Sequence, residues 1–283
     1  MTQSNVMRAA AVQMDVRLGE VSHNLAVMLA KLHEAADHGA KLVVFPECAL
    51  TGYGFESREE AWPYAQAIPG PSVQSFAAEC ARREIWAIYG LLERDGECLY
   101  NSCVLVGPNG VVGSYRKVHL PFLGVDRFTD PGNRPFEVQE IGRLRVGMHI
   151  CYDGAFPESG RVLGLLGADL LVLPTNWPPH SECAAEHMIA CRAFENVVFA
   201  VAVNRVGEER GFRFIGRSSF ADPKGTILAM ASPDDEEILY ADIDPARSRQ
   251  KRLVRVPGKH EVDRIGDRRP SFYRTIVEPN GRE

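Results

Sequence analysis

The sequence has little that would point to a membrane, a disulfide framework or a nucleic acid. Its longest apolar stretches, such as residues 197–203, are far shorter than the ~20 residues that a membrane-spanning helix needs. Its seven cysteines are an odd number and form no Cys-x-x-Cys pair, which favours a reducing cytoplasm over a set of disulfides. The net charge of −5 argues against a nucleic-acid binder.

The chain also has no feature that would divide it. It carries no Ser/Gly tract, repeat or low-complexity block, and residues 1–5 do not begin a basic-then-apolar signal peptide. The hydrophobic share of 45% in 283 residues is ample for a core. We therefore expect one cytoplasmic domain over residues 1–283, with residues 256–283 as a C-terminal tail of little periodicity that contacts a partner subunit.

Hydrophobic periodicity predicts alternating strands and helices, so the fold class is α/β. In residues 22–38, Leu25, Met28, Leu29 and Leu32 share one helical face. Hairpin-like segments late in the chain predict a mixed sheet, and the pattern alone leaves a doubly wound arrangement open. The predicted strands are 7–14, 41–45, 85–91, 102–106, 111–117, 144–150, 169–173, 197–203, 214–220, 226–231 and 237–242, and the predicted helices are 22–38, 72–83, 157–166 and 181–195.

One cysteine stands in an unusual context. An apolar run over residues 146–150 ends abruptly at Cys151, a turn with Gly154 follows, and Pro157 opens a predicted helix. A strand, sharp turn and helix would place the thiol beside the N-terminus of the helix, where the helix dipole favours a thiolate. Cys151 is therefore a candidate nucleophile.

Two further strand ends carry candidate partners for this thiol. Glu47 follows the apolar run 42–46, and Lys117 ends the strand 111–117. In α/β sheets, sites gather where strands end. Taken singly, a buried cysteine, a solvated carboxylate and a surface lysine are the commoner explanations. Together the three residues fit one mechanism.

The segments around these residues resemble the three signature motifs of the nitrilase superfamily, also called carbon–nitrogen hydrolases, in order and in spacing. The resemblance covers nearly the whole chain and implies a four-layer α-β-β-α sandwich with mixed sheets. The motif segments are Phe45-Pro46-Glu47, Tyr115 to Pro121 and Cys151-Tyr152-Asp153 with Phe156-Pro157-Glu158, and the likeness continues through residues 168–178, 192–196, 204–205 and 221–225.

The resemblance implies a role for each motif residue. Cys151 would be the nucleophile, Glu47 the general base and Lys117 the electrostatic stabiliser. Lys117 and the backbone N–H of Tyr152 would hold the oxyanion while a thioester forms on the sulfur and an amine or ammonia leaves. Glu47 would then activate the water that hydrolyses the thioester. No metal and no cofactor is required.

Members of the superfamily often carry a second acidic residue between the lysine and the cysteine, usually glutamate. Asp126 is the best match here, although its shorter side chain leaves two alternatives, pairing with Arg127 or capping a turn. Glu137 is a weaker candidate because it lies beyond the Pro131-Gly132 turn. We count Asp126 among the catalytic residues.

The residues beside the nucleophile indicate the branch. Tyr152-Asp153 resembles the amidase-like form rather than the Trp-Glu of true nitrilases, and Gly154 and Ala155 replace the arginines that hold the carboxylate of N-carbamoyl D-amino acids. A small linear amide without a required carboxylate is therefore the expected substrate. The predicted substrate-binding residues are Tyr53, Tyr152, Asn176 and Trp177.

Alternatives remain open at this level. An N-carbamoyl amine hydrolase, a nitrilase, a metallohydrolase with Cys151 as a ligand and a catalytically silent scaffold that binds a ligand all fit parts of the pattern. Four histidines (119, 149, 180 and 187) lack a metal-ligand spacing. The basic segment 247–255 is expected to be a solvated helix or a subunit contact. By resemblance, helix 181–195 is expected to pair with its copy in a homodimer or higher even oligomer, with neither nucleic acid nor membrane as a partner.

Overall fold

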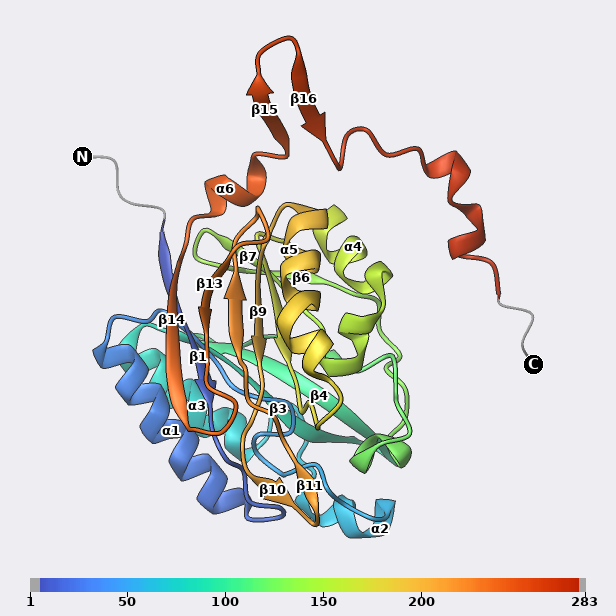
Figure 1. Ribbon diagram of the computed structural model, residues 1–283. Coiled ribbons are helices and arrows are strands. Elements are labelled where there is room, and N and C mark those ends of the chain that lie inside the picture. The colour runs from blue at the N-terminus through green and yellow to red at the C-terminus, as the bar shows by residue number, and fades with distance from the viewer. Residues whose placement is uncertain (1–5, 280–283) are drawn as a thin grey trace.

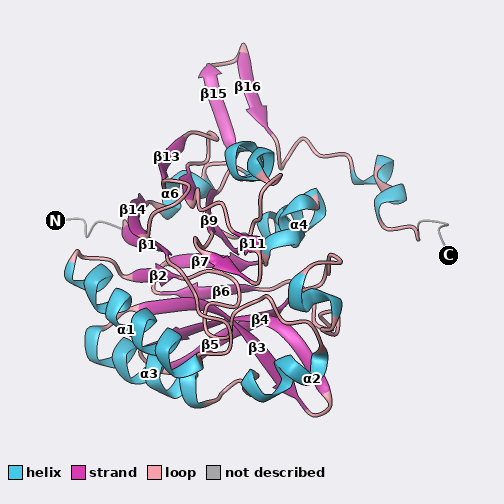
Figure 2. Ribbon diagram, turned by 60° about the horizontal axis from the view of Figure 1, so that its bottom comes forward, coloured by secondary structure: helices cyan, strands magenta, loops and turns pink. Residues whose placement is uncertain are grey.

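Two mixed six-stranded sheets lie face to face between two layers of helices in the computed structural model, which describes residues 6–279 (Figure 1). Figure 2 shows α1 and α3 covering one side of the sandwich and α4 the other. The predicted four-layer α-β-β-α sandwich is thus confirmed, and the doubly wound alternative is excluded. Along the first sheet the strands are β14 (Glu237–Ile243), β1 (Met7–Gln13), β2 (Leu42–Val44), β3 (Trp86–Asp95), β4 (Cys98–Gly107) and β5 (Gly110–Arg116); along the second they are β13 (Ile227–Met230), β12 (Ser219–Ala221), β9 (Phe199–Val203), β8 (Leu170–Pro174), β7 (Leu144–Met148) and β6 (Val138–Ile141).

Helices connect and cover these strands. α3 begins at Pro71, a residue suited to the first helical position, and ends where Glu84 turns into the left-handed region with a φ of 53°. None of the helices in residues 6–279 is long and apolar enough to cross a membrane. The helical elements are α1 (Val21–Asp37), α2 (Arg58–Ala61), η1 (Trp62–Tyr64), α3 (Pro71–Arg83), η2 (Gly124–Arg127), η3 (Cys151–Ala155), α4 (Pro157–Leu165), the π-helix η4 (Ala184–Met188), α5 (Ile189–Asn196), α6 (Pro245–Arg249), η5 (Pro270–Phe272) and η6 (Arg274–Ile276).

Both sheets have three parallel strands at their centre, and this arrangement positions the site. β1, β2 and β3 are parallel in the first sheet, and β7, β8 and β9 are parallel in the second. Parallel strands present their carboxyl ends at one edge of the sheet. The segments that follow β2, β7 and β8 carry Glu47, Cys151 and Asn176 respectively.

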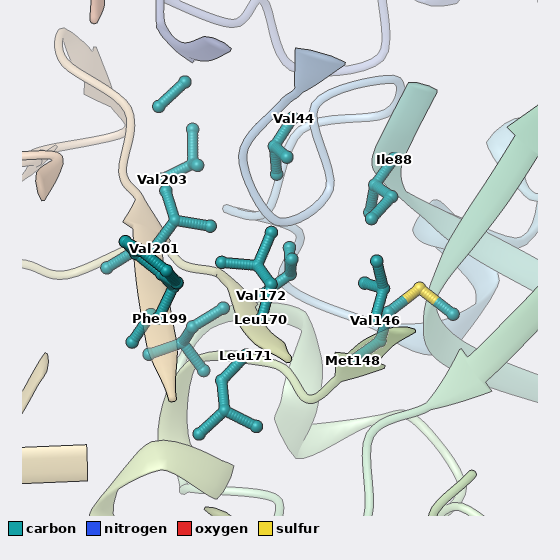
Figure 3. Close-up of a cluster of buried hydrophobic side chains, with 14 of the residues drawn as sticks. Val44, Ile88, Val146, Met148, Leu170, Leu171, Val172, Phe199, Val201 and Val203 are labelled. Carbon is teal, nitrogen blue, oxygen red and sulfur yellow. The ribbon is translucent and has the colours of Figure 1, made fainter. Parts of the chain in front are cut away.

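Side chains alternate along each strand, so a central strand such as β2 contributes to two apolar layers of the core. Val43 of β2 packs outward in a layer with Leu32 of α1 and Phe76 of α3. The next residue, Val44, points inward and packs with Val172 of the opposite sheet, as Figure 3 shows. Each fully buried valine or leucine of this kind contributes about 1.5–3 kcal/mol of burial free energy.

The structure corrects several predicted elements. The predicted strand 214–220 is only β12, because Gly216 and Arg217 take positive φ angles of 55° and 58° that interrupt an extended chain. The predicted helix 181–195 is the π-helix η4 followed by α5. The basic segment 247–255 is not one helix but the end of α6 and most of β15 (Arg252–Val256).

Two small hairpins were not predicted from the sequence. β10 (Glu208–Glu209) pairs with β11 (Phe212–Arg213), and β15 pairs with β16 (His260–Asp263). The second hairpin stands away from the sandwich, and residues 264–279 continue beyond it (Figure 1). The tail therefore has regular structure that its weak periodicity did not indicate; its last residues, 280–283, lie outside the described part of the chain.

Candidate active site

The centre of the candidate site is a buried lysine shared by two carboxylates. The Lys117 ammonium follows β5 and lies 2.7 Å from Oε1 of Glu47 and 2.5 Å from Oδ2 of Asp126. All three side chains are fully buried. Asp126 therefore pairs with Lys117, and the alternative pairing with Arg127 is wrong, since the Arg127 guanidinium donates to the carbonyl oxygen of Gly124 instead.

Glu137, the weaker acidic candidate, lies apart from this cluster. Its side chain is exposed and accepts a hydrogen bond from Gln139 at 3.2 Å. Glu158 is likewise exposed, in the first turn of α4. Neither residue contributes to the buried cluster.

Asn101 of β4 completes the cluster, and sequence reasoning missed it. Its Nδ2 donates to Oε1 of Glu47 at 2.7 Å and to Oδ1 of Asp126 at 2.8 Å. Both hydrogen bonds hold the two carboxylates in fixed positions on either side of Lys117. The one signal in the sequence was a polar residue within the otherwise apolar run of β4.

Tyr53 lies closer to the cluster than the sequence indicated. It was predicted to bind the substrate; it is buried, and its hydroxyl donates to Oδ2 of Asp126 at 2.8 Å. Burial raises the pKa of the Tyr53 hydroxyl well above its ordinary value, and the charge of Asp126 adds to this effect. The hydroxyl therefore stays protonated and donates its proton to Asp126 or to the carbonyl oxygen of Leu123, which lies 3.0 Å away.

Burial makes Glu47 a stronger base than an exposed carboxylate. Desolvation raises the pKa of Glu47 most, the charge of Asp126 raises it further, and Lys117 opposes both. Its Oε1 is occupied by Lys117 and Asn101, whereas its Oε2 has no partner among the described residues. One carboxylate oxygen is thus held in place and the other is free to accept a proton.

Cys151 occupies the first position of η3 with a strained backbone. Its φ of 45° lies in the left-handed region, which is rare for a residue other than glycine. The thiol is 7% exposed, and burial raises its pKa to about 12, with the charge of Glu47 adding to the rise. Pro157 begins α4 as predicted, but the prediction that the thiolate is favoured is wrong, because burial raises the pKa of the thiol above its ordinary value.

The surroundings of the sulfur nevertheless favour its ionisation in part. The charge of Lys117, the hydroxyl of Thr175 and the backbone N–H of Asn176 each lower the pKa of Cys151 against the larger effect of burial. A thiol in this position needs a base to react at neutral pH. The charge of Glu47 acts on the Cys151 thiol, and Oε2 of Glu47 has no hydrogen-bond partner among the described residues, so Glu47 is the candidate base.

Asp153 ties the turn that holds the cysteine to the segment that holds the lysine. Its carboxylate accepts hydrogen bonds from the backbone N–H of Ile150 at 2.9 Å, the Tyr115 hydroxyl at 2.8 Å and the His119 backbone N–H at 3.0 Å, and it pairs with His119 Nδ1 at 2.7 Å. Burial acts to raise the pKa of Asp153, but the bonds from His119 and Ile150 hold it below its ordinary value. The carboxylate is therefore a charged anchor between the two sheets.

The other predicted substrate-binding residues lie around the cysteine at different depths. Tyr152 is 42% exposed and meets the Phe156 ring edge-on at 5.1 Å. Asn176 is buried, and neither its Nδ2 nor its Oδ1 has a partner among the described residues. Trp177 is buried, and its backbone N–H donates to Asn204 at 2.9 Å. Their roles in binding remain predictions.

His149 is close to the cysteine in sequence but is not a base for it. The ring is buried, and its Nδ1 lies 3.0 Å from the Ser159 hydroxyl. Desolvation lowers the pKa of His149 to about 4, so the imidazole is neutral at pH 7. Within residues 6–279, no group of three or more histidine, cysteine, aspartate or glutamate side chains is arranged to hold a metal ion.

Comparisons with known proteins agree with this geometry. The profile of a family described as carbon-nitrogen hydrolase matches residues 8–253. A protein of Pyrococcus abyssi named nitrilase is 42% identical over 95% of this chain and 99% of its own length. An (R)-stereoselective amidase of a Pseudomonas species is 33% identical over 98% of this chain and 97% of its own length.

Solved structures support the fold. The crystal structure of an amidase from Nesterenkonia sp. superposes with a TM-score of 0.80 at 24% identity, covering 98% of both chains. At this sequence identity the structural similarity supports only the fold, the α-β-β-α sandwich.

Proposed function

The chain belongs to the carbon–nitrogen hydrolase family, and from this premise we propose that it hydrolyses a small linear amide through a thioester on Cys151 and releases ammonia. The observation that carries the proposal is the buried Glu47, which has one oxygen fixed by Lys117 and the other free, and whose charge acts on a thiol that is protonated at neutral pH. This arrangement supplies a base where the thiol needs one.

The reaction follows from the state of each group. Glu47 takes the thiol proton as the sulfur of Cys151 attacks the carbonyl carbon. The negative charge that develops on the carbonyl oxygen is stabilised by the Lys117 ammonium and the backbone N–H of Tyr152. Protonated Glu47 passes its proton to the nitrogen, the C–N bond breaks, and ammonia leaves a thioester on the sulfur.

Water completes the cycle. Glu47 is again a carboxylate once ammonia has left, and it deprotonates the water that attacks the thioester carbon. The C–S bond then breaks, the proton returns to the sulfur, and the carboxylic acid leaves. Asp126 keeps Lys117 in place and Asn101 keeps Glu47 in place, and a hydrogen bond joins Asn101 to Asp126.

The shape of the site favours a small acyl group. The Cys151 thiol is only 7% exposed, and Gly154 and Ala155 offer no charged side chain for a carboxylate. Tyr152-Asp153 supports amides over nitriles. Nitrile hydrolysis is the second candidate, because the relative that is 42% identical carries the name nitrilase.

Ammonia release from primary amides, N-carbamoyl amines and nitriles tests the proposal. We expect release from at least one short-chain amide, its loss in Cys151→Ala, and no change in Cys183→Ala, which alters an exposed thiol. Carbon dioxide released with the ammonia would indicate an N-carbamoyl substrate. Ammonia release that persists in Cys151→Ala would contradict the proposal, as would the absence of ammonia release from all three substrate classes.

We further propose that the chain forms a homodimer in which an arm, defined as residues 252–279, packs on a partner copy. The arm projects from the sandwich in both overall views and carries Phe272 and Val277, each more than 80% exposed (Figures 1 and 2). Ile276 in the same short segment is exposed as well, and an exposed apolar patch marks an interaction surface. Light scattering should give at least twice the 31.3 kDa chain mass, and a monomer would refute this arrangement.

A reducing compartment such as the cytoplasm suits a chain whose seven cysteines are all free.

A further inference from the structure

A buried ion pair outside the catalytic cluster holds the loop that carries Tyr53. Oε2 of Glu209, in β10, accepts hydrogen bonds from the backbone N–H groups of Tyr53 at 2.9 Å and Gly54 at 2.8 Å. Its other oxygen, Oε1, pairs with the guanidinium of Arg205. The Arg205 and Glu209 side chains are 0% and 2% exposed, so water does not compete for either group.

Arg205 is itself fixed on every side. Its guanidinium donates to the carbonyl oxygen of Val16 at 2.5 Å and to Asp15 at 2.8 Å, and it lies 4.4 Å from the centre of the Phe214 ring. A planar guanidinium with this many partners has a single orientation. It therefore fixes the orientation of the Glu209 carboxylate.

The loop fits its neighbours with no spare room. A Cβ added at Gly52 would lie 2.9 Å from Oε1 of Glu209, and one added at Gly124 would lie 2.2 Å from Cε1 of Tyr53. The backbone carbonyl of Tyr53 also accepts from the Val125 N–H at 2.8 Å. A small shift of the loop would thus move the Tyr53 hydroxyl relative to its partner.

That partner is Asp126, which shares Lys117 with Glu47. The chain of direct contacts runs from Glu209 through the Tyr53 backbone and the Tyr53 hydroxyl, at 2.8 Å, to Asp126, and from there at 2.5 Å to Lys117. Each of these contacts is a hydrogen bond or ion pair between buried groups, where water cannot replace a lost or displaced partner.

We propose that Glu209 is a positioning residue for the hydrolysis, which fixes the Tyr53 hydroxyl against Asp126 and thereby the placement of Lys117. The inference rests on the proposed function. Glu209 touches neither Cys151 nor Lys117 in any hydrogen bond of the described residues, so it acts through Tyr53.

The chemistry of this contact requires a carboxylate. Donors face it from both sides, the Arg205 guanidinium on one and two backbone N–H groups on the other, and only a carboxylate offers acceptors in both directions. Glu209→Gln has nearly the same shape but places an NH₂ group against one set of donors. Glu208→Gln changes an exposed neighbour on the same strand and is the matched control.

Alkylation of Cys151 by chloroacetamide, followed by peptide mass mapping, reports on the site without requiring turnover of an amide. The sulfur displaces chloride and the thiol proton passes to Glu47, so the rate depends on the arrangement of the cluster. Exposed Cys183 in the same molecule serves as an internal standard. We expect Glu209→Gln to slow alkylation of Cys151 about 10- to 100-fold, as a displaced catalytic group does, while Cys183 and Glu208→Gln are unaffected.

Repeating the Glu209→Gln measurement in a Tyr53→Phe variant distinguishes a positioning role of Glu209 from a general loss of packing. In Tyr53→Phe the hydroxyl that Glu209 is proposed to place is absent, so Glu209→Gln should then slow alkylation less than threefold, a non-additive result. Where amides are turned over, kcat should fall by a similar factor with KM changed less than about threefold. Should Glu209→Gln fail to fold, Glu209→Asp, which keeps both acceptor oxygens, should give a smaller loss with the same dependence on Tyr53.

Equal losses in the two backgrounds, or an unchanged rate in Glu209→Gln, would overturn the proposal. Failure of the proposed function gives a different result. Cys151 would still be alkylated in a manner that depends on Glu209, while no amide, N-carbamoyl amine or nitrile released ammonia.

Discussion

Replacing Lys117 by methionine should destabilise the protein as well as inactivate it. The substitution leaves Glu47 and Asp126 buried together without the cation that lies 2.7 Å and 2.5 Å from them. Removing one partner of a buried ion pair costs about 3–5 kcal/mol because the remaining charge is left uncompensated. For a chain of this size each kcal/mol lowers Tm by roughly 2–4 °C. We therefore expect a fall of about 6–20 °C near pH 8.

The loss of stability in Lys117→Met should increase as pH rises. Burial already raises the pKa of Glu47 above its ordinary value of 4.5, and Lys117 opposes that rise, so removing Lys117 raises the folded-state pKa further. Above pH 4.5 the folded variant then holds a proton that the unfolded chain has released. Its stability must fall as pH rises through this window and recover toward pH 5.

Thermal melting of Lys117→Met between pH 5 and 8.5 measures this effect. Lys31→Met is the control, because Lys31 pairs with Glu34 at 3.4 Å on the surface, where a pair contributes about 0–1 kcal/mol. Adding Asp126→Asn to Lys117→Met should restore part of the lost stability, since only one carboxylate then lacks a partner. A Lys117→Met variant as stable as the unmodified protein at pH 8, or one that weakens toward pH 5 relative to it, would refute the reasoning.

Three further predictions follow from the same geometry. At pH 7 a thiol with a pKa of about 12 is ionised in about one molecule in 10⁵, so it needs a base. Glu47→Gln should therefore slow hydrolysis about 10²- to 10⁴-fold in initial-rate assays. A loss below threefold would show that another group is the base. Gly124→Ala should lower both Tm and kcat, because its Cβ would lie 2.2 Å from the Tyr53 ring at a φ of 50°, and wild-type values of both would contradict the contact. Neutral His149 costs stability as pH falls from 6.5 toward 4, by about 3 kcal/mol in all; in denaturant titrations His149→Gln should lack that acid-induced loss, and an unchanged pH dependence would place its origin elsewhere.

The sequence was sufficient to predict the residues that end the strands, because those positions follow from local signals. Glu47, Lys117 and Cys151 each lie just after a strand, and the motif resemblance predicted the α-β-β-α sandwich that the structure has. Contacts between segments far apart in the chain were harder to predict. Asn101 contributes because its side chain on β4 reaches Glu47, which follows β2, a strand that is not its neighbour in the sheet. Glu209 contributes through a hairpin of two-residue strands with no periodicity.

The ionisation of Cys151 shows why local signals are insufficient for chemistry. The turn and the following helix are visible in the sequence, but the burial of the thiol, which has the largest effect on its pKa, depends on how the whole chain packs. The same holds for Tyr53, whose hydroxyl reaches Asp126 because Gly124 allows a close approach that no pattern indicates.

The most direct measurement of the central claim is the mass of the protein acid-quenched during turnover of a short primary amide. Hydrolysis through a thioester predicts a population heavier by the acyl group less one hydrogen, with the added mass on the peptide that contains Cys151 and absent from Cys151→Ala. Turnover with the full quenched population at its original mass in rapid-mixing experiments, or an acyl group on another residue, would contradict it.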